Sequence, residues 1–163
     1  MSTLAKLALA MLAVAVSGVM TKAQSAESIV GTWRLVSWIE EETESKAVHK
    51  NFGDNPLGFA TYTSDGHMMI MITDPSRKRA ADPKATDAEA AQLYRTMLAY
   101  AGRYTLEGDK ITHHVDISWN QLNGDLQRFV EVKNNQLTIK TPPFVSPFLN
   151  KQIVATVVLE RAK

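Results

Sequence analysis

The chain has 163 residues, of which 45% are hydrophobic and 21% are charged, a composition typical of one globular domain rather than of a disordered segment. Its 18 basic and 17 acidic residues give a formal net charge of +1, so the sequence lacks the strongly basic character typical of nucleic-acid-binding proteins, and we expect no such partner. It has no cysteine, which excludes disulfide bonds, thiolate metal sites, a cysteine nucleophile and lipid attachment through cysteine.

The first 25 residues have the pattern of a secretory signal peptide. Lys6 precedes an apolar stretch over residues 7–20, and the small residues that follow allow cleavage after Ala23 or Ser25. A membrane-spanning helix needs about 20 apolar residues, and this stretch is shorter. We therefore expect a signal peptide over residues 1–25 and a folded domain over residues 28–163. The protein is then periplasmic or secreted, with no stable membrane insertion once the leader is removed.

Short apolar segments separated by turn-forming residues make up most of the chain after the leader. Asp65-Gly66 between two such segments is typical of a β-hairpin. The expected strands are residues 29–42, 57–63, 68–73, 103–106, 110–119, 126–133, 136–141 and 152–161. Eight strands joined mostly by short connections are typical of an antiparallel up-and-down barrel or of a sandwich.

One segment, residues 87–101, is predicted to be a helix. Thr86 and Glu89 have the spacing of a capping box at its start, and Gly102 follows its end. Its apolar residues recur at helical spacing and form one face. We expect this face to pack against the wall of the barrel.

Alternation along the strands predicts which side chains face the interior. The apolar face of residues 110–119 consists of Ile111, His113, Val115, Ile117 and Trp119. His114 lies on the opposite face, and by the same rule Tyr104 and Arg128 face inward. Because an unpaired buried charge costs several kcal/mol, Arg128 needs an acidic neighbour, a ring of carbonyls or a water-filled pocket. It either pairs within the barrel or orients a polar group of a ligand.

A series of short motifs in chain order points to a known family. The motifs are Gly31-Thr32-Trp33-Arg34-Leu35-Val36-Ser37-Trp38, Pro56-Leu57-Gly58, Tyr62-Thr63, Asp65-Gly66, Tyr100-Ala101-Gly102-Arg103-Tyr104, His113-His114-Val115, Gln127-Arg128, Leu137-Thr138, Thr141-Pro142-Pro143 and Glu160-Arg161. Together they resemble the bacterial and fungal lipocalin-like domain proteins over most of residues 28–163. The chain departs from that family at Leu159, where the family often has tryptophan, and in a shorter loop after Trp119.

The resemblance implies a single all-β domain: an eight-stranded antiparallel up-and-down barrel of the calycin type with one α-helix. It implies that Trp33 packs near one end of the barrel against Arg161, a structural contact to which we assign no chemistry. It also implies a cavity lined by apolar and aromatic groups and suited to hydrophobic ligands.

From these patterns we expect an exported protein that binds a small hydrophobic molecule inside the barrel, as a monomer or weak homodimer and without a cofactor. The residues expected to contact the ligand are Tyr62, Met69, Met71, Tyr100, Tyr104, His113, Trp119, Arg128 and Phe144. Tyr100 and Phe144 are expected near a mouth of the barrel. Several flexible methionines in the wall favour an adaptable site, although methionines also fill gaps in ordinary cores.

Two alternative functions remain open at this point. The first is an isomerase or cyclase in which a desolvated, neutral His113 acts as the base and Arg128 or Tyr104 stabilises an enolate or carboxylate. In the competing interpretation, His113 hydrogen-bonds Tyr104 or a ligand carbonyl, and we assign no catalytic residue. The second is a structural envelope protein with a filled barrel. The four histidines lack the spacing of a metal site, so no metal is expected.

Overall fold

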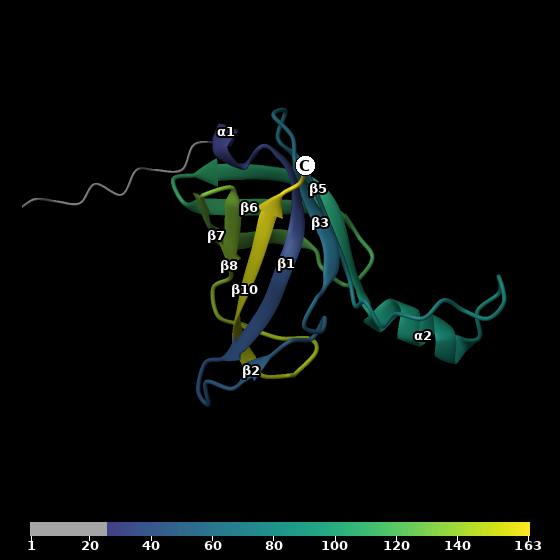
Figure 1. The fold of residues 1–163 in the computed structure, drawn as a ribbon. Helices are drawn as coiled ribbons and strands as arrows, with labels where there is room; N and C mark the ends of the chain where they lie inside the picture. The colour runs from purple at the N-terminus through teal and green to yellow at the C-terminus, as the bar shows by residue number, and fades with distance from the viewer. Residues whose placement is uncertain (1–25) are drawn as a thin grey trace, which may run out of the picture.

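The computed structural model describes residues 26–163 (Figure 1). The segment predicted to be a signal peptide, residues 1–25, lies outside the described residues. The elements in chain order are α1 (Ala26–Ile29), β1 (Gly31–Glu42), β2 (Val48–His49), β3 (Leu57–Tyr62), β4 (His67–Thr73), α2 (Asp87–Arg95), β5 (Met97–Glu107), β6 (Lys110–Ser118), β7 (Gly124–Lys133), β8 (Gln136–Lys140), β9 (Phe144–Val145) and β10 (Gln152–Arg161).

Eight of these strands close into a barrel. The order around the wall is β1-β3-β4-β5-β6-β7-β8-β10, and the neighbouring strands are antiparallel. The ring closes because β1 and β10 also pair with each other, from Trp33↔Arg161 to Glu42↔Ile153. The two-residue strands β2 and β9 extend the sheet at one end of β1 and β10. The predicted eight-stranded antiparallel barrel is confirmed.

The prediction that residues 87–101 form one helix is wrong for its second half. α2 ends at Arg95, and the residues from Met97 onward begin the long strand β5. This strand pairs with β4 on one side and with β6 on the other. Because a strand in the middle of a sheet satisfies its backbone N–H and C=O groups on both sides, this pairing overrides the helical spacing of the apolar residues.

The start of α2 matches its prediction, whereas its packing does not. Glu89 N–H donates to the Thr86 hydroxyl (3.3 Å), and Thr86 N–H donates to the Glu89 carboxylate (2.8 Å), which completes the capping box. However, no residue of α2 is buried, and the helix stands away from the barrel (Figure 1). With half of its expected apolar face now in β5, the helix has too little apolar surface to cover the wall. The centroids of the Tyr94 and Trp119 rings are 6.4 Å apart.

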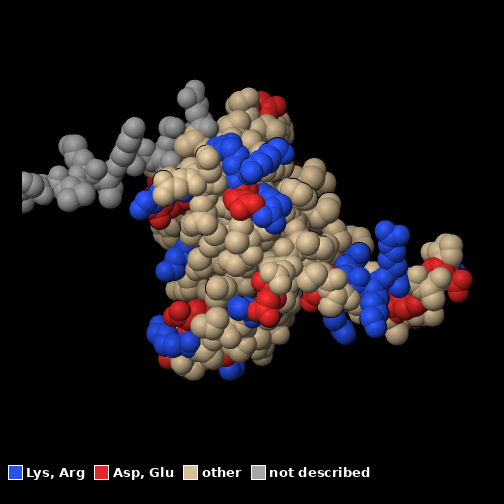
Figure 2. Space-filling view, viewed as in Figure 1, with Lys and Arg blue, Asp and Glu red and all other residues tan. Residues whose placement is uncertain are grey.

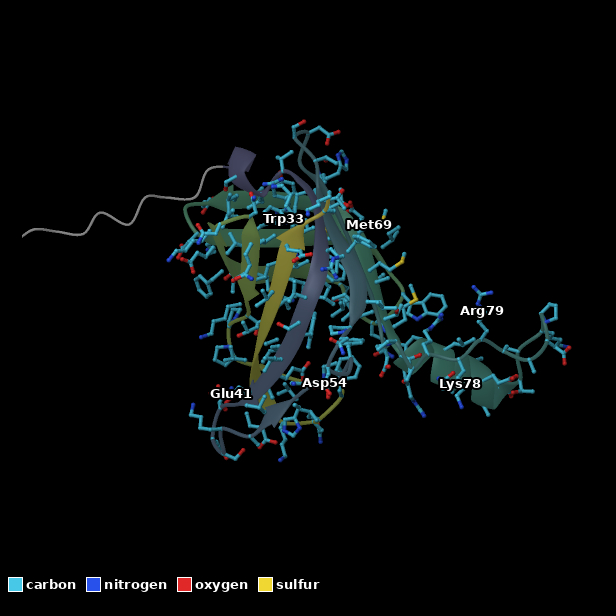
Figure 3. All side chains as sticks on the ribbon, in the orientation of Figure 1. Trp33, Glu41, Asp54, Met69, Lys78 and Arg79 are labelled. Atoms are coloured by element: carbon cyan, nitrogen blue, oxygen red, sulfur yellow. The ribbon has the colours of Figure 1, made fainter. Side chains whose placement is uncertain are left out.

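Side chains of β4 alternate strictly between the interior and the exterior. Met68, Ile70 and Ile72 are buried, whereas Met69 and Met71 are 54% and 46% exposed. Met69, labelled in Figure 3, is therefore on the outer wall. The prediction that Met69 and Met71 line the interior is wrong. A strand that is apolar on both faces gives no alternation from which its inward face could be chosen.

A β-bulge reverses the alternation in β6. The pairing of β5 with β6 shifts by one residue between Ala101 and the next position, which leaves Asp116 as the extra residue. His113, before the bulge, is fully buried. Ile117 and Trp119, after it, are 70% and 48% exposed. The prediction that Ile117 and Trp119 face inward is wrong, because a bulge moves the inward position by one residue.

Trp33 lies at one end of the barrel, where the first strand, β1, pairs with the last, β10 (Figure 3). Its side chain is fully buried, and its indole N–H donates to the Ile29 carbonyl at 2.7 Å. The guanidinium carbon of Arg161 lies 4.2 Å from the centre of the Trp33 ring. Arg161 also donates to the carbonyls of Val30 and Ser28. This arrangement is the contact that the family resemblance implies.

Positive and negative side chains are interspersed on the surface seen in Figure 2. The segment between β4 and β5 that contains α2, residues 74–96, has charges of both signs as well. Within residues 26–163, no helix is both long enough and apolar enough to span a membrane.

Candidate functional site

The barrel interior contains a cavity with a mostly apolar wall. Its aliphatic lining comes from inward positions of four strands, β4, β5, β8 and β10: Ile70, Ile72, Leu98, Ile139, Val157 and Leu159. The polar residues that reach it are Glu40, Tyr100, His113, Arg128 and Thr141. Phe144 and Phe148 line it near β9, and Phe148 is 39% exposed, so the cavity approaches solvent at that end.

The cavity is narrow. All the space between its atoms, including open solvent at its mouth, amounts to about 740 Å³. The volume that the centre of a water molecule can occupy is only about 70 Å³. One water needs roughly 10–15 Å³ of such space, so the interior has room for about five to seven waters. This volume suits a compact molecule, such as a single substituted ring, better than a long acyl chain.

His113 stands between two tyrosines at the cavity wall. The hydroxyl of Tyr62 (β3) lies 3.0 Å from its Nε2 atom, and the hydroxyl of Tyr100 (β5) lies 3.0 Å from its Nδ1 atom. His113 is fully buried, and Tyr62 and Tyr100 are 1% and 7% exposed. Because both ring nitrogens are occupied, His113 has no free nitrogen with which to take a proton directly from a bound molecule.

Burial keeps the three hydrogen-bonded side chains, Tyr62, His113 and Tyr100, neutral. Desolvation, followed by the positive charge of Arg128, lowers the pKa of His113 from 6.5 to about 3. Desolvation raises the pKa of Tyr100 to about 12, although the charge of Arg128 and its hydrogen bond to that hydroxyl act in the opposite direction. Burial also raises the pKa of Tyr62 well above 10. At neutral pH the imidazole therefore has one N–H and one lone pair.

Hydrogen-bonding balance decides which nitrogen of His113 carries the proton. Tyr62 is buried, and within the described residues the hydrogen-bond partner of its hydroxyl is the His113 ring. If that hydroxyl accepted a hydrogen bond from Nε2–H, its own hydrogen would lack an acceptor, at a cost of about 1–3 kcal/mol. Tyr62 therefore donates to Nε2, and Nδ1–H donates to the Tyr100 oxygen. The Tyr100 hydrogen then remains available on the cavity side.

Arg128 reaches the same part of the cavity from β7. It is half-buried, and its Nη1 atom donates to the carbonyl of Gln127 at 2.7 Å. None of the ion pairs formed within residues 26–163 involves Arg128. The acidic neighbour that was one of the environments expected for Arg128 is therefore not found among the residues described, and Arg128 lines the cavity.

Tyr104 does not belong to this group. Its hydroxyl donates to the Thr63 carbonyl at 2.8 Å, and its ring packs edge-on against Tyr62 with centroids 5.2 Å apart. The prediction that His113 hydrogen-bonds Tyr104 is wrong, because Tyr104 sits directly across from His113 on β5 and points its hydroxyl along the barrel to the β3–β4 turn. Tyr104 is also not placed to act as a polar stabiliser with His113.

Of the nine residues expected to contact a ligand, four line the cavity: Tyr100, His113, Arg128 and Phe144. Tyr62 lies behind His113, and Tyr104 packs behind Tyr62. Met69, Met71 and Trp119 are on the exterior. The interior group is thus smaller than expected, and its polar members gather around the Tyr100 hydroxyl.

Glu40 is a buried polar residue of the cavity that the sequence did not single out. It is 1% exposed, accepts from the Trp38 indole N–H at 3.2 Å and accepts from the Ser146 hydroxyl at 2.7 Å. The pairing of β1 with β10 shifts between Leu35 and Ser37, which turns Glu40 inward. The only sequence signal was a glutamate on a strand rich in apolar residues.

The residues described contain no cluster of three or more histidines, aspartates and glutamates that could bind a metal ion.

A family model described as a lipocalin-like domain matches residues 30–163 of the chain. The search of curated proteins found no match.

Proposed function

The chain belongs to the lipocalin-like domain family, and from this premise we propose that its barrel binds a small, largely apolar molecule in the interior cavity. The observation that carries the proposal is the apolar cavity with a few polar groups gathered at Tyr100, His113 and Arg128. Sites for small molecules are typically apolar clefts in which a few placed polar groups fix the orientation of the ligand. The volume of about 70 Å³ favours a compact ligand.

Filling the cavity is expected to weaken binding. Ala60 is 1% exposed and lines the cavity, so Ala60→Ile places three additional carbon atoms in it. We expect the affinity for a compact ring compound, such as benzoate or methyl benzoate, to fall at least tenfold, which corresponds to about 1.4 kcal/mol. Isothermal titration calorimetry measures this change.

Ala99→Ile is the matched control. Ala99 is on the outer side of β5, where it pairs with the exposed Met71, so the same added side chain does not enter the cavity. Unchanged affinity in Ala99→Ile together with loss in Ala60→Ile supports interior binding. Equal affinity in both variants contradicts it and leaves an exterior site or a filled structural barrel as the alternative.

We further propose that the protein is exported. The support is the pattern of residues 1–25, with Lys6 before an apolar stretch and small residues after it. Mass spectrometry of the protein from its own host is expected to find an N-terminus at Gln24 or Ala26. Recovery of the chain with residues 1–25 intact in the cytoplasmic fraction would rule out this proposal.

A further inference from the structure

The Tyr100 hydroxyl is held from the wall of the barrel by His113. His113 Nδ1–H donates to its oxygen, and Arg128 lines the same cavity. A hydroxyl has one hydrogen of its own, and because the imidazole N–H is the donor in this contact, that hydrogen is not used by His113. It therefore offers a hydrogen to a molecule in the cavity.

Arg128 supplies the second donor at the same place. A guanidinium has five N–H groups in a planar fork, and the contact to Gln127 uses only part of them. The charge has no carboxylate partner within residues 26–163. A partly buried cation beside an apolar cavity gains most from an anion that reaches it from the cavity side.

We propose that the bound molecule is a compact monocarboxylic acid in its anionic form, whose carboxylate accepts from the Tyr100 hydroxyl and the Arg128 guanidinium. This inference rests on the proposed function, because it assumes that the cavity holds a ligand. A carboxylate accepts hydrogen bonds without donating any and matches the fork of a guanidinium. The apolar body of the acid then contacts side chains such as Ile70 and Ile139.

Glu40 limits the number of acidic groups on the ligand. Its carboxylate lines the same cavity and is held by the side chains of Trp38 and Ser146. A second carboxylate on the ligand would face this acidic group in a narrow, poorly solvated space. Monocarboxylates are therefore expected to bind more tightly than dicarboxylates that have the same ring.

The test compares matched acids and esters by calorimetry at neutral pH. Benzoate and cyclohexanecarboxylate are expected to bind at least tenfold more tightly than their methyl esters and than terephthalate. Arg128→Gln and Tyr100→Phe are each expected to weaken acid binding about tenfold while leaving ester binding unchanged, because each removes one donor and keeps the apolar wall. Arg103→Gln, on the exterior of β5, is the matched control and is expected to keep the preference for acids.

The outcomes separate this inference from the function on which it rests. If acids and esters bind equally well, or if Arg128→Gln and Tyr100→Phe keep the preference for acids, the carboxylate inference is overturned while interior binding stands. If neither acids nor esters bind to the wild-type protein at millimolar concentration, the proposed function fails and the inference fails with it. Melting temperatures of the variants show that each is folded at the temperature of the titration.

Discussion

Replacing Trp33 with alanine is expected to lower the free energy of unfolding by about 3–5 kcal/mol, the usual cost of removing a large buried aromatic side chain. Trp33 is fully buried, its N–H is bonded to Ile29, and its ring supports the guanidinium of Arg161. The variant loses all three contacts at the point where β1 and β10 close the barrel. Urea unfolding followed by circular dichroism measures the loss.

Trp119→Ala is the control for this prediction. Trp119 is 48% exposed, so its removal is expected to cost less than about 1 kcal/mol. Equal losses in the two variants would contradict the structural role assigned to Trp33.

Lowering the pH from 7.5 to 5 is expected to reduce the free energy of unfolding by about 2 kcal/mol through His113. The folded barrel lowers the pKa of His113 from 6.5 to about 3, so between these values the unfolded chain binds a proton that the folded protein does not. Stability therefore rises with pH across this interval. The contribution of His113 is complete above about pH 6.5 and is lost as the pH falls toward 3.

The variant His113→Gln isolates this contribution. Glutamine keeps a donor and an acceptor between the two tyrosines but does not titrate. The main acidic counterpart is Glu42, whose pKa is lowered to about 2 chiefly by its hydrogen bond to Lys151, so its contribution changes below pH 4.5. Urea unfolding at both pH values is expected to show a smaller pH dependence in His113→Gln than in the wild type. The same dependence in both proteins would mean that His113 is not the group responsible.

Local sequence patterns predict the strands, and the family resemblance selects a barrel over a sandwich, but neither predicts all of its inward faces. The turn at Asp65-Gly66 and the capping box at Thr86 are local signals, and both are present in the structure. Bulges in β1 and β6 each add one residue and thereby exchange the inward and outward positions that follow. The bulge in β6 moved Trp119 outward, and the one in β1 moved Glu40 inward.

Gly102 marks the second bulge, although its position after residues 87–101 predicts the end of a helix. In the structure, a Cβ atom at this position would lie 2.0 Å from the His114 carbonyl oxygen. The close approach of the two backbones at the bulge therefore requires glycine. The bulge itself depends on pairing between β5 and β6, which local spacing does not reveal.

The candidate site could be predicted only in part, for a related reason. Alternation correctly places His113 and Arg128 on the inner side of the wall, whereas Tyr100 falls within the segment predicted to be a helix. Their hydrogen bonds could not be predicted, because Tyr62 and His113 are 51 residues apart in the chain. The choice between Tyr62 and Tyr104 as the partner of His113 depends on how the barrel closes.

The most direct test of interior binding is methyl NMR of the protein labelled at isoleucine and methionine, recorded with and without benzoate or methyl benzoate, whichever binds more tightly. Inward and outward methyl groups alternate along β4, so each serves as a control for its neighbour. Binding in the cavity predicts large shifts at Ile70, Ile72 and Ile139 and none at the exposed Met69 and Met71. Shifts confined to Met69 and Met71, or no shifts at saturating ligand, would contradict the account.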